Sequence, residues 1–173
     1  MSQALETRAD CSRCAALCCI AYPSEDMPGF AAVKEAGEPC PKLAANGLCT
    51  IYEKREEEGF SGCIKYECFG AGQHVVQSLF SGRDWRDDPA LLGPLVSTFL
   101  AMRPVSDLAY LVELAMEAVE TDQDTATLLE MREELAQIAS SRANLADQGR
   151  IARAEATIKR IYGSIGRAKF RES

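Results

Sequence analysis

The sequence predicts a mainly α protein, in which a loop-rich cysteine-cluster module is packed on an antiparallel helical bundle. Two observations predict this fold. All eight cysteines lie in the first 70 residues, together with most of the Gly and Pro turns. Apolar residues recur at helical spacing through the rest of the chain. We therefore expect the cysteine module over residues 1–75 and the helical bundle over residues 76–173.

The densest cysteine segment is CSRCAALCC, which starts at Cys11. If this segment is helical, steps of about 100° per residue place Cys11, Cys14 and Cys18 within roughly 60° of one another, with Cys19 turned aside. Adjacent residues diverge too far on a helix to serve one small tetrahedral ion comfortably. Cys18 and Cys19 therefore either reach two different metals, or one of them has a packing role.

Turn-forming residues surround the remaining cysteines, so short helices and loops are expected there. A segment with few long apolar stripes has little core of its own, and bound metal is one way to order it. The turn-rich strings are YPSEDMPGF (22–30), GEPCPK (37–42), NGLC (46–49), GFSGC (59–63) and FGAGQ (69–73).

The second part of the chain predicts four helices. Asp87 or Asp88 is the expected N-cap of the first, with Pro89 at its first helical position. Pro104 is expected to end that helix and to lie in the first turn of the next. Short connections between amphipathic helices favour antiparallel packing. The apolar stripes of the four helices span residues 91–100, 108–119, 128–138 and 151–165.

The start of the chain, MSQALETRAD, has neither a basic nor an apolar targeting region. No uninterrupted apolar run reaches the about 18 residues that a membrane span needs. We therefore expect a cytoplasmic protein with no membrane partner. Thiols in a reducing compartment do not persist as structural disulfides, so this cysteine pattern indicates metal ligation or redox chemistry.

The formal net charge of −7 argues against nucleic acid as a partner, because phosphate binding needs concentrated positive charge. A protein partner is left open.

Thiolate-only ligation favours zinc, iron–sulfur or cuprous copper over magnesium and calcium. Structural zinc takes four thiolate or imidazole ligands, and an iron–sulfur cluster also commonly takes four cysteines. Eight thiols make two such sites, or one site with four thiols left over, and the single histidine, His74, cannot supply a His-rich site. The candidate metal ligands are Cys11, Cys14, Cys18, Cys19, Cys40, Cys49, Cys63 and Cys68.

The strings CAALCC, PCPKL, GLCTIYEKR and CIKY, in this order, resemble the YkgJ-type cysteine-cluster family, which is described as zinc- or iron-chelating. The last part departs from the family pattern, since Glu56 follows Arg55 where the family has proline, and Ile64 replaces an arginine. The resemblance implies a metal-binding module over residues 1–75 and supports ligand roles for Cys14, Cys18, Cys40, Cys49 and Cys63.

A closer resemblance covers roughly residues 9–120. The strings CSRCAALCC, GFSGC, CFGAGQHV and GRDWRDDP are similar to the N-terminal Cys-rich region of bacterial pentapeptide repeat-containing proteins, here without the repeats. This resemblance implies a metal-binding module and does not indicate any reaction that the protein catalyses.

Three functional hypotheses follow from the cysteines. The first is a metal-binding protein without catalysis, in which zinc or an iron–sulfur cluster, at one or two sites, supports a partner-binding surface. The second is an iron–sulfur redox enzyme or accessory, and the third is metal storage, delivery or sensing. The scarcity of acid–base groups near the cysteines argues against an enzyme.

Overall fold

The computed structural model describes residues 4–24 and 28–171. Helices make up 58% of the protein, and no strand forms within those two ranges, which confirms the mainly α fold. One isolated antiparallel bridge joins Leu43 to Cys49.

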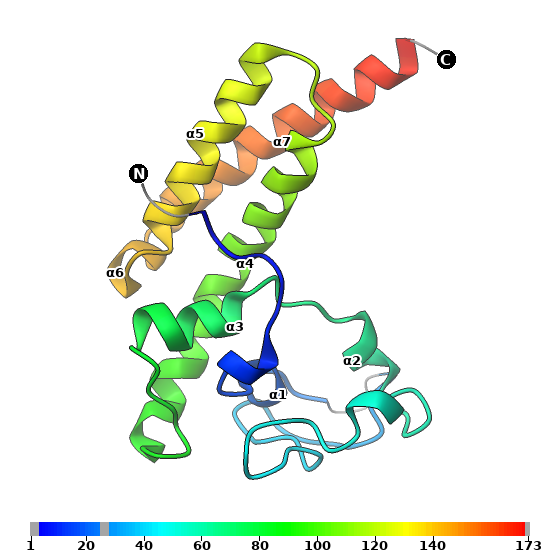
Figure 1. The fold of residues 1–173 in the computed structure, drawn as a ribbon, viewed down its shortest axis with the longest axis vertical. Helices are drawn as coiled ribbons and strands as arrows, with labels where there is room; N and C mark the ends of the chain where they lie inside the picture. The colour runs from blue at the N-terminus through cyan, green and yellow to red at the C-terminus, as the bar shows by residue number, and fades with distance from the viewer. Residues whose placement is uncertain (1–3, 25–27, 172–173) are drawn as a thin grey trace. The chain divides into compact units, whose positions relative to one another are not determined.

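The helical elements are short before residue 92 and mostly long after it (Figure 1). In chain order they are η1 (Cys11–Arg13), α1 (Leu17–Ala21), η2 (Tyr52–Lys54), α2 (Ser61–Lys65), α3 (Ala71–His74), η3 (Val75–Leu79), η4 (Pro89–Leu91), α4 (Leu92–Met116), α5 (Asp122–Ile138), α6 (Arg142–Leu145) and α7 (Gln148–Arg171).

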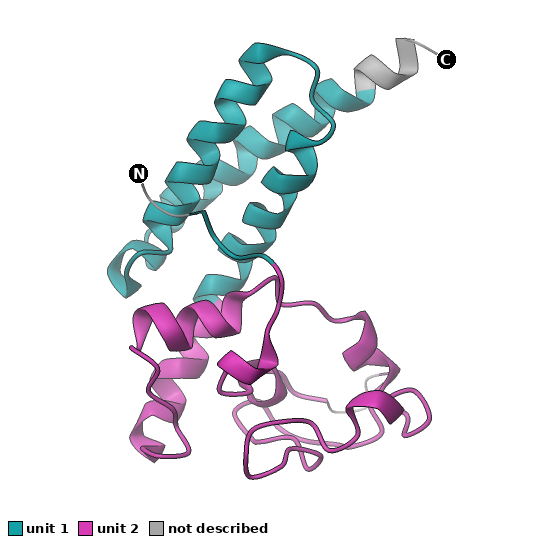
Figure 2. Cartoon of the chain, viewed as in Figure 1, with its two compact units in different colours: residues 1–7, 101–173 teal, residues 8–100 magenta. Residues whose placement is uncertain are grey.

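The chain divides into two compact units, shown in Figure 2. Unit 1 contains residues 1–7 and 101–173, and unit 2 contains residues 8–100. Residues 76–100 thus share a compact unit with all eight cysteines. The predicted domain boundary after residue 75, between the cysteine module and the helical bundle, stays a prediction.

Unit 1 is built from antiparallel helices: α5 runs opposite to α7 and to the last part of α4 (Figure 1). Thr121 caps α5 by accepting a hydrogen bond from the Asp124 amide at 3.1 Å. The Arg150 guanidinium binds both carboxylate oxygens of Glu134 at 2.7 and 2.8 Å and so links α7 to α5. The Tyr162 hydroxyl donates to the Leu111 carbonyl at 2.8 Å, which links α7 to α4.

The helix α4 continues through Pro104, so the prediction that this proline ends one helix and starts another was wrong. A proline inside a helix costs about 3 kcal/mol, because it removes one hydrogen bond and crowds the preceding turn. Met102 and Val105, on either side of it, are almost completely buried. Each such side chain contributes about 1.5–3 kcal/mol, which is enough to offset that cost. The predicted start is confirmed, since Asp88 accepts a hydrogen bond from the Ala90 amide and Pro89 begins η4.

Unit 2 has a small apolar core to which only part of its length contributes. Leu17, Ile20, Val75, Leu95 and Phe99 are all fully buried. Residues 22–24 and 28–59 bury no apolar side chain. This long loop region therefore needs another source of order.

By length and composition, one helix of the described ranges could cross a membrane. It spans Pro89–Met116, with a mean hydropathy of 1.3, and half of that window is buried. The buried core helix of a globular protein has the same composition, so this is weak evidence for a membrane span.

Candidate metal centre

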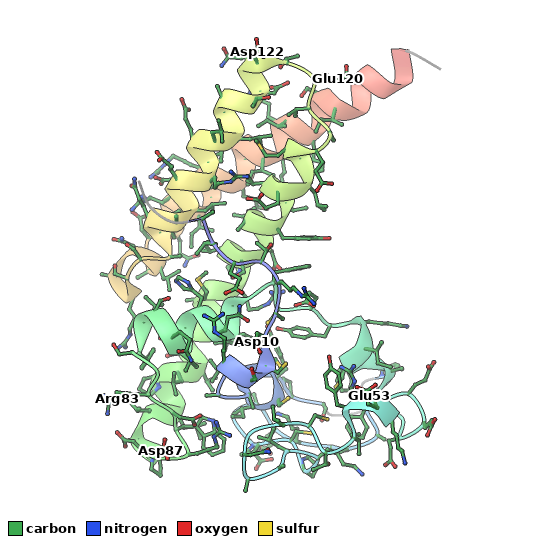
Figure 3. All side chains as sticks on the ribbon, viewed as in Figure 1. Asp10, Glu53, Arg83, Asp87, Glu120 and Asp122 are labelled. Carbon is green, nitrogen blue, oxygen red and sulfur yellow. The ribbon has the colours of Figure 1, made fainter. Side chains whose placement is uncertain are left out.

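All eight cysteines are free thiols within unit 2. They lie on η1, α1 and α2 and in the loops between η1 and α3. Sulfur atoms are visible beside the turn that carries Asp10 in Figure 3. Cys11 is exposed, whereas the other seven are half-buried. The candidate ligands are therefore accessible enough to react or bind and are not simply core residues.

The segment 11–19 is not a single helix, so the helical placement of its cysteines was wrong. It forms the short turn η1, then an extended residue at Cys14, then α1 after Ala16 in the left-handed conformation at φ 55°. Asp10 accepts from the Ser12 amide and starts the turn. The Trp85 indole donates to the Ala15 carbonyl at 2.8 Å and fixes the break between η1 and α1.

A first thiol group (Cys11, Cys14 and Cys68) lies where η1 meets the start of α3. Gln73, which is 3% exposed, joins the two elements: its side chain accepts from the Asp10 amide and donates to the Arg8 carbonyl. The Cys68 carbonyl accepts from the Ala71 amide at 3.0 Å and so precedes α3 directly.

The Cys14 sulfur lies against the backbone of α3. A Cβ atom added at Gly72 would come within 2.5 Å of it. The absence of a side chain at Gly72 is therefore what admits this thiol.

A second thiol group (Cys40, Cys49 and Cys63) lies around the loops after α1. The Cys40 amide donates to the Cys19 carbonyl at 3.0 Å. The bridge between Leu43 and Cys49 folds the next loop back, and the Leu43 amide donates to the Cys40 carbonyl. The Arg55 guanidinium donates to the Cys63 carbonyl at 3.4 Å.

In the first thiol group, burial and the charge that neighbouring thiols would carry both disfavour ionisation. Burial raises the pKa of Cys14 to about 12, and negative charge at Cys68 and Cys11 adds to the rise. Burial, and next the charge of Cys68, also raise the pKa of Cys11. The pKa of Cys18 is raised by its hydrogen bond to Cys19, by burial, and by the charges of Cys14 and Cys68. A bound cation would favour the thiolate forms instead.

The second thiol group shows the same pattern with different partners. Burial raises the pKa of Cys63 to about 11, and the charges of Cys19, Cys40 and Cys49 add to it. Burial is also the main cause that raises the pKa of Cys40, again with contributions from Cys19 and Cys49.

Cys19 differs from the other thiols. Its sulfur is 3.9 Å from that of Cys18, so the expectation that these adjacent side chains diverge too far to serve one ion was wrong. The hydrogen bond from Cys18, together with the charges of Lys34 and Arg55, lowers the pKa of Cys19 to about 7 against the effect of burial. Lys34 is held near by donating to the Ile20 carbonyl at 3.1 Å.

We expect Cys19 to be the cysteine of its peptide that alkylates fastest in protein stripped of metal. A thiol of pKa about 7 is roughly half ionised at neutral pH, whereas Cys14, with a pKa of about 12, has a thiolate fraction smaller by roughly four orders of magnitude. Brief treatment with iodoacetamide, followed by tandem mass spectrometry of the peptide after Arg13, measures both. Equal labelling of Cys14 and Cys19 would contradict this assignment.

No three Cys, His, Asp or Glu side chains within residues 4–24 and 28–171 are arranged so that they could already hold one metal ion. The donor chemistry nevertheless fits a soft metal, since one compact unit contains eight free thiols. Ligation would require the loops to close further, as happens when metal binding is coupled to folding.

The sequence interpretation missed Gln73, Lys34 and Gly72 as residues that position the thiols. Gln73 and Lys34 act by donating to backbone carbonyls of segments far from them in the chain. No local pattern encodes such contacts. Gly72 lies in the string FGAGQ, which signals a turn but not the close approach of a sulfur atom.

Comparison with known proteins gives one informative relative. "Uncharacterized protein YybG" of Bacillus subtilis (strain 168) is 39% identical over 108 residues. The match covers 62% of this chain and 39% of the relative's length. No protein-family model matches the chain. No solved structure matches it.

Proposed function

We propose that unit 2 is a thiolate metal-binding module that holds zinc or an iron–sulfur cluster. The observation that carries this proposal is that all eight cysteines are free thiols of one compact unit. In a reducing compartment, such a set of thiols has no structural use as disulfides. Bound metal would stabilise the loops of residues 22–24 and 28–59, which bury no apolar side chain.

The metal has a structural role in this proposal. It would fix the loops and short helices that carry four exposed apolar side chains, which are available to a protein partner. These side chains are Val33, Leu48, Tyr52 and Ile64, between 43% and 70% exposed. The resemblance to zinc- or iron-chelating proteins of the YkgJ type supports the same function.

The test is elemental analysis by mass spectrometry of protein purified without oxygen, together with its visible spectrum and a labile-sulfide assay. Colourless zinc in stoichiometric amount would support a structural module. Stoichiometric iron with sulfide and brown absorbance would favour the redox alternative within the same module. Eight free thiols without metal would refute the proposal.

A further inference from the structure

We propose that the eight cysteines form two separate four-thiolate metal sites, which are divided between the adjacent residues Cys18 and Cys19 of α1. This inference rests on the metal-binding function proposed above. Four thiolates complete a structural zinc site and also commonly hold an iron–sulfur cluster. The first site takes Cys11, Cys14, Cys18 and Cys68, and the second takes Cys19, Cys40, Cys49 and Cys63.

The first thiol group lacks a fourth member, and we assign Cys18 to it, because the backbone of the adjacent Cys19 is bonded to Cys40 of the second group. Cys11 and Cys14 flank one turn, in which the Cys14 amide donates to the Cys11 carbonyl at 3.3 Å. Gln73 ties this turn to the helix that follows Cys68. The electrostatic neighbours of Cys18 beyond Cys19 are members of this group, Cys14 and Cys68.

The second thiol group lacks a fourth member as well, and backbone contacts place Cys19 beside it. The hydrogen bond from the Cys40 amide to the Cys19 carbonyl holds these two residues together. Cys19 also contributes to the electrostatics of both Cys40 and Cys63. The interaction that crosses from Cys19 to Cys11 is weaker than that between Cys11 and Cys68.

Cys18 and Cys19 could instead share one ion. Their sulfur atoms are 3.9 Å apart, close to the about 3.8 Å separation of two thiolates on one tetrahedral zinc with Zn–S bonds of about 2.3 Å. The surroundings argue for division, because the Cys19 carbonyl is bonded to the Cys40 amide, whereas the thiols that act on Cys18 besides Cys19 are Cys14 and Cys68. If the pair shared one ion, a second four-thiolate site would have to combine members of both thiol groups.

The test compares Cys18→Ser with Cys19→Ser in the full chain, each purified without oxygen, by metal content relative to the unaltered protein. These variants make the same substitution at neighbouring positions, so each is the matched control of the other. We expect each to retain part of the metal, with the two losses adding up to the full content. Cys18→Ser/Cys68→Ser should lose no more than Cys18→Ser, whereas Cys18→Ser/Cys49→Ser should lose nearly all.

Hydrogen exchange gives a second measurement that does not depend on metal counting. Cys68→Ser should increase hydrogen exchange in residues 8–14 and leave residues 40–50 nearly unchanged. Cys49→Ser should have the opposite pattern. Loss of all metal in both single variants, or equal loss in the two double variants, would overturn the division while leaving metal binding intact. Absence of metal from the unaltered protein would overturn both proposals.

Discussion

Removing the metal should loosen the cysteine loops of unit 2 while leaving the helices of unit 1 folded. Residues 22–24 and 28–59 bury no apolar side chain, so hydrophobic burial does not offset the backbone entropy of ordering them. Metal binding contributes about 10–16 kcal/mol in zinc-finger peptides, a scale sufficient to order such loops. In unit 1, Leu128, Leu135 and Ile161 are fully or almost fully buried and do not depend on the cysteines.

Hydrogen exchange with mass spectrometry, before and after treatment with a strong chelator, measures this difference. Protection of residues 28–59 should fall by at least about 100-fold, whereas residues 122–138 should keep theirs. Restoring the metal should restore protection. Unchanged exchange in the loops after verified metal removal would show that the metal does not order them.

Removing one proposed ligand, by Cys49→Ser, should have the same kind of effect as removing the metal. It should lower metal content and protease resistance of the loops without melting the helices. Thr50→Ser is the matched control, because it introduces serine at the adjacent position and preserves the hydroxyl that donates to the Lys42 carbonyl at 2.9 Å. If the two variants have equal metal content and protease resistance, Cys49 is not a ligand.

The long helices were predictable because their signals are local. The apolar stripe of residues 128–138 and the cap at Asp88 each depend on residues within a few positions. The outcome at Pro104 was not predictable in this way, because burial of residues around it decides whether the helix continues. Local propensity favoured a break there, and tertiary packing prevailed.

The geometry around the cysteines was predictable only in part. Their residue type and number indicated soft-metal chemistry, which stays a prediction. The break between η1 and α1 depends on Trp85, which lies 70 residues from its acceptor Ala15. The contact of Cys14 with Gly72 also joins segments that are far apart in the chain. Such long-range pairs leave no periodic signal in the sequence.

Gly72→Ala should destabilise unit 2 and weaken metal retention, although this exchange usually stabilises a helix. Replacing Gly by Ala in a compatible helical position gains about 0.4–1 kcal/mol. At Gly72, however, the new methyl group would lie 2.5 Å from the Cys14 sulfur and 3.9 Å from the Phe99 ring. Overpacking of this kind costs about 1–3 kcal/mol, and it displaces the thiol from its place against α3.

Gly93→Ala is the matched control for this prediction, because a methyl group there meets no atom within 4 Å. It should leave metal content unchanged and alter the free energy of unfolding by no more than about 1 kcal/mol in the stabilising direction. Chemical denaturation and elemental analysis of both variants separate a general helix effect from displacement of Cys14. If Gly72→Ala matched Gly93→Ala in both measurements, the close contact between Cys14 and α3 would not exist in solution, and a ligand role for Cys14 at that position would lose its structural basis.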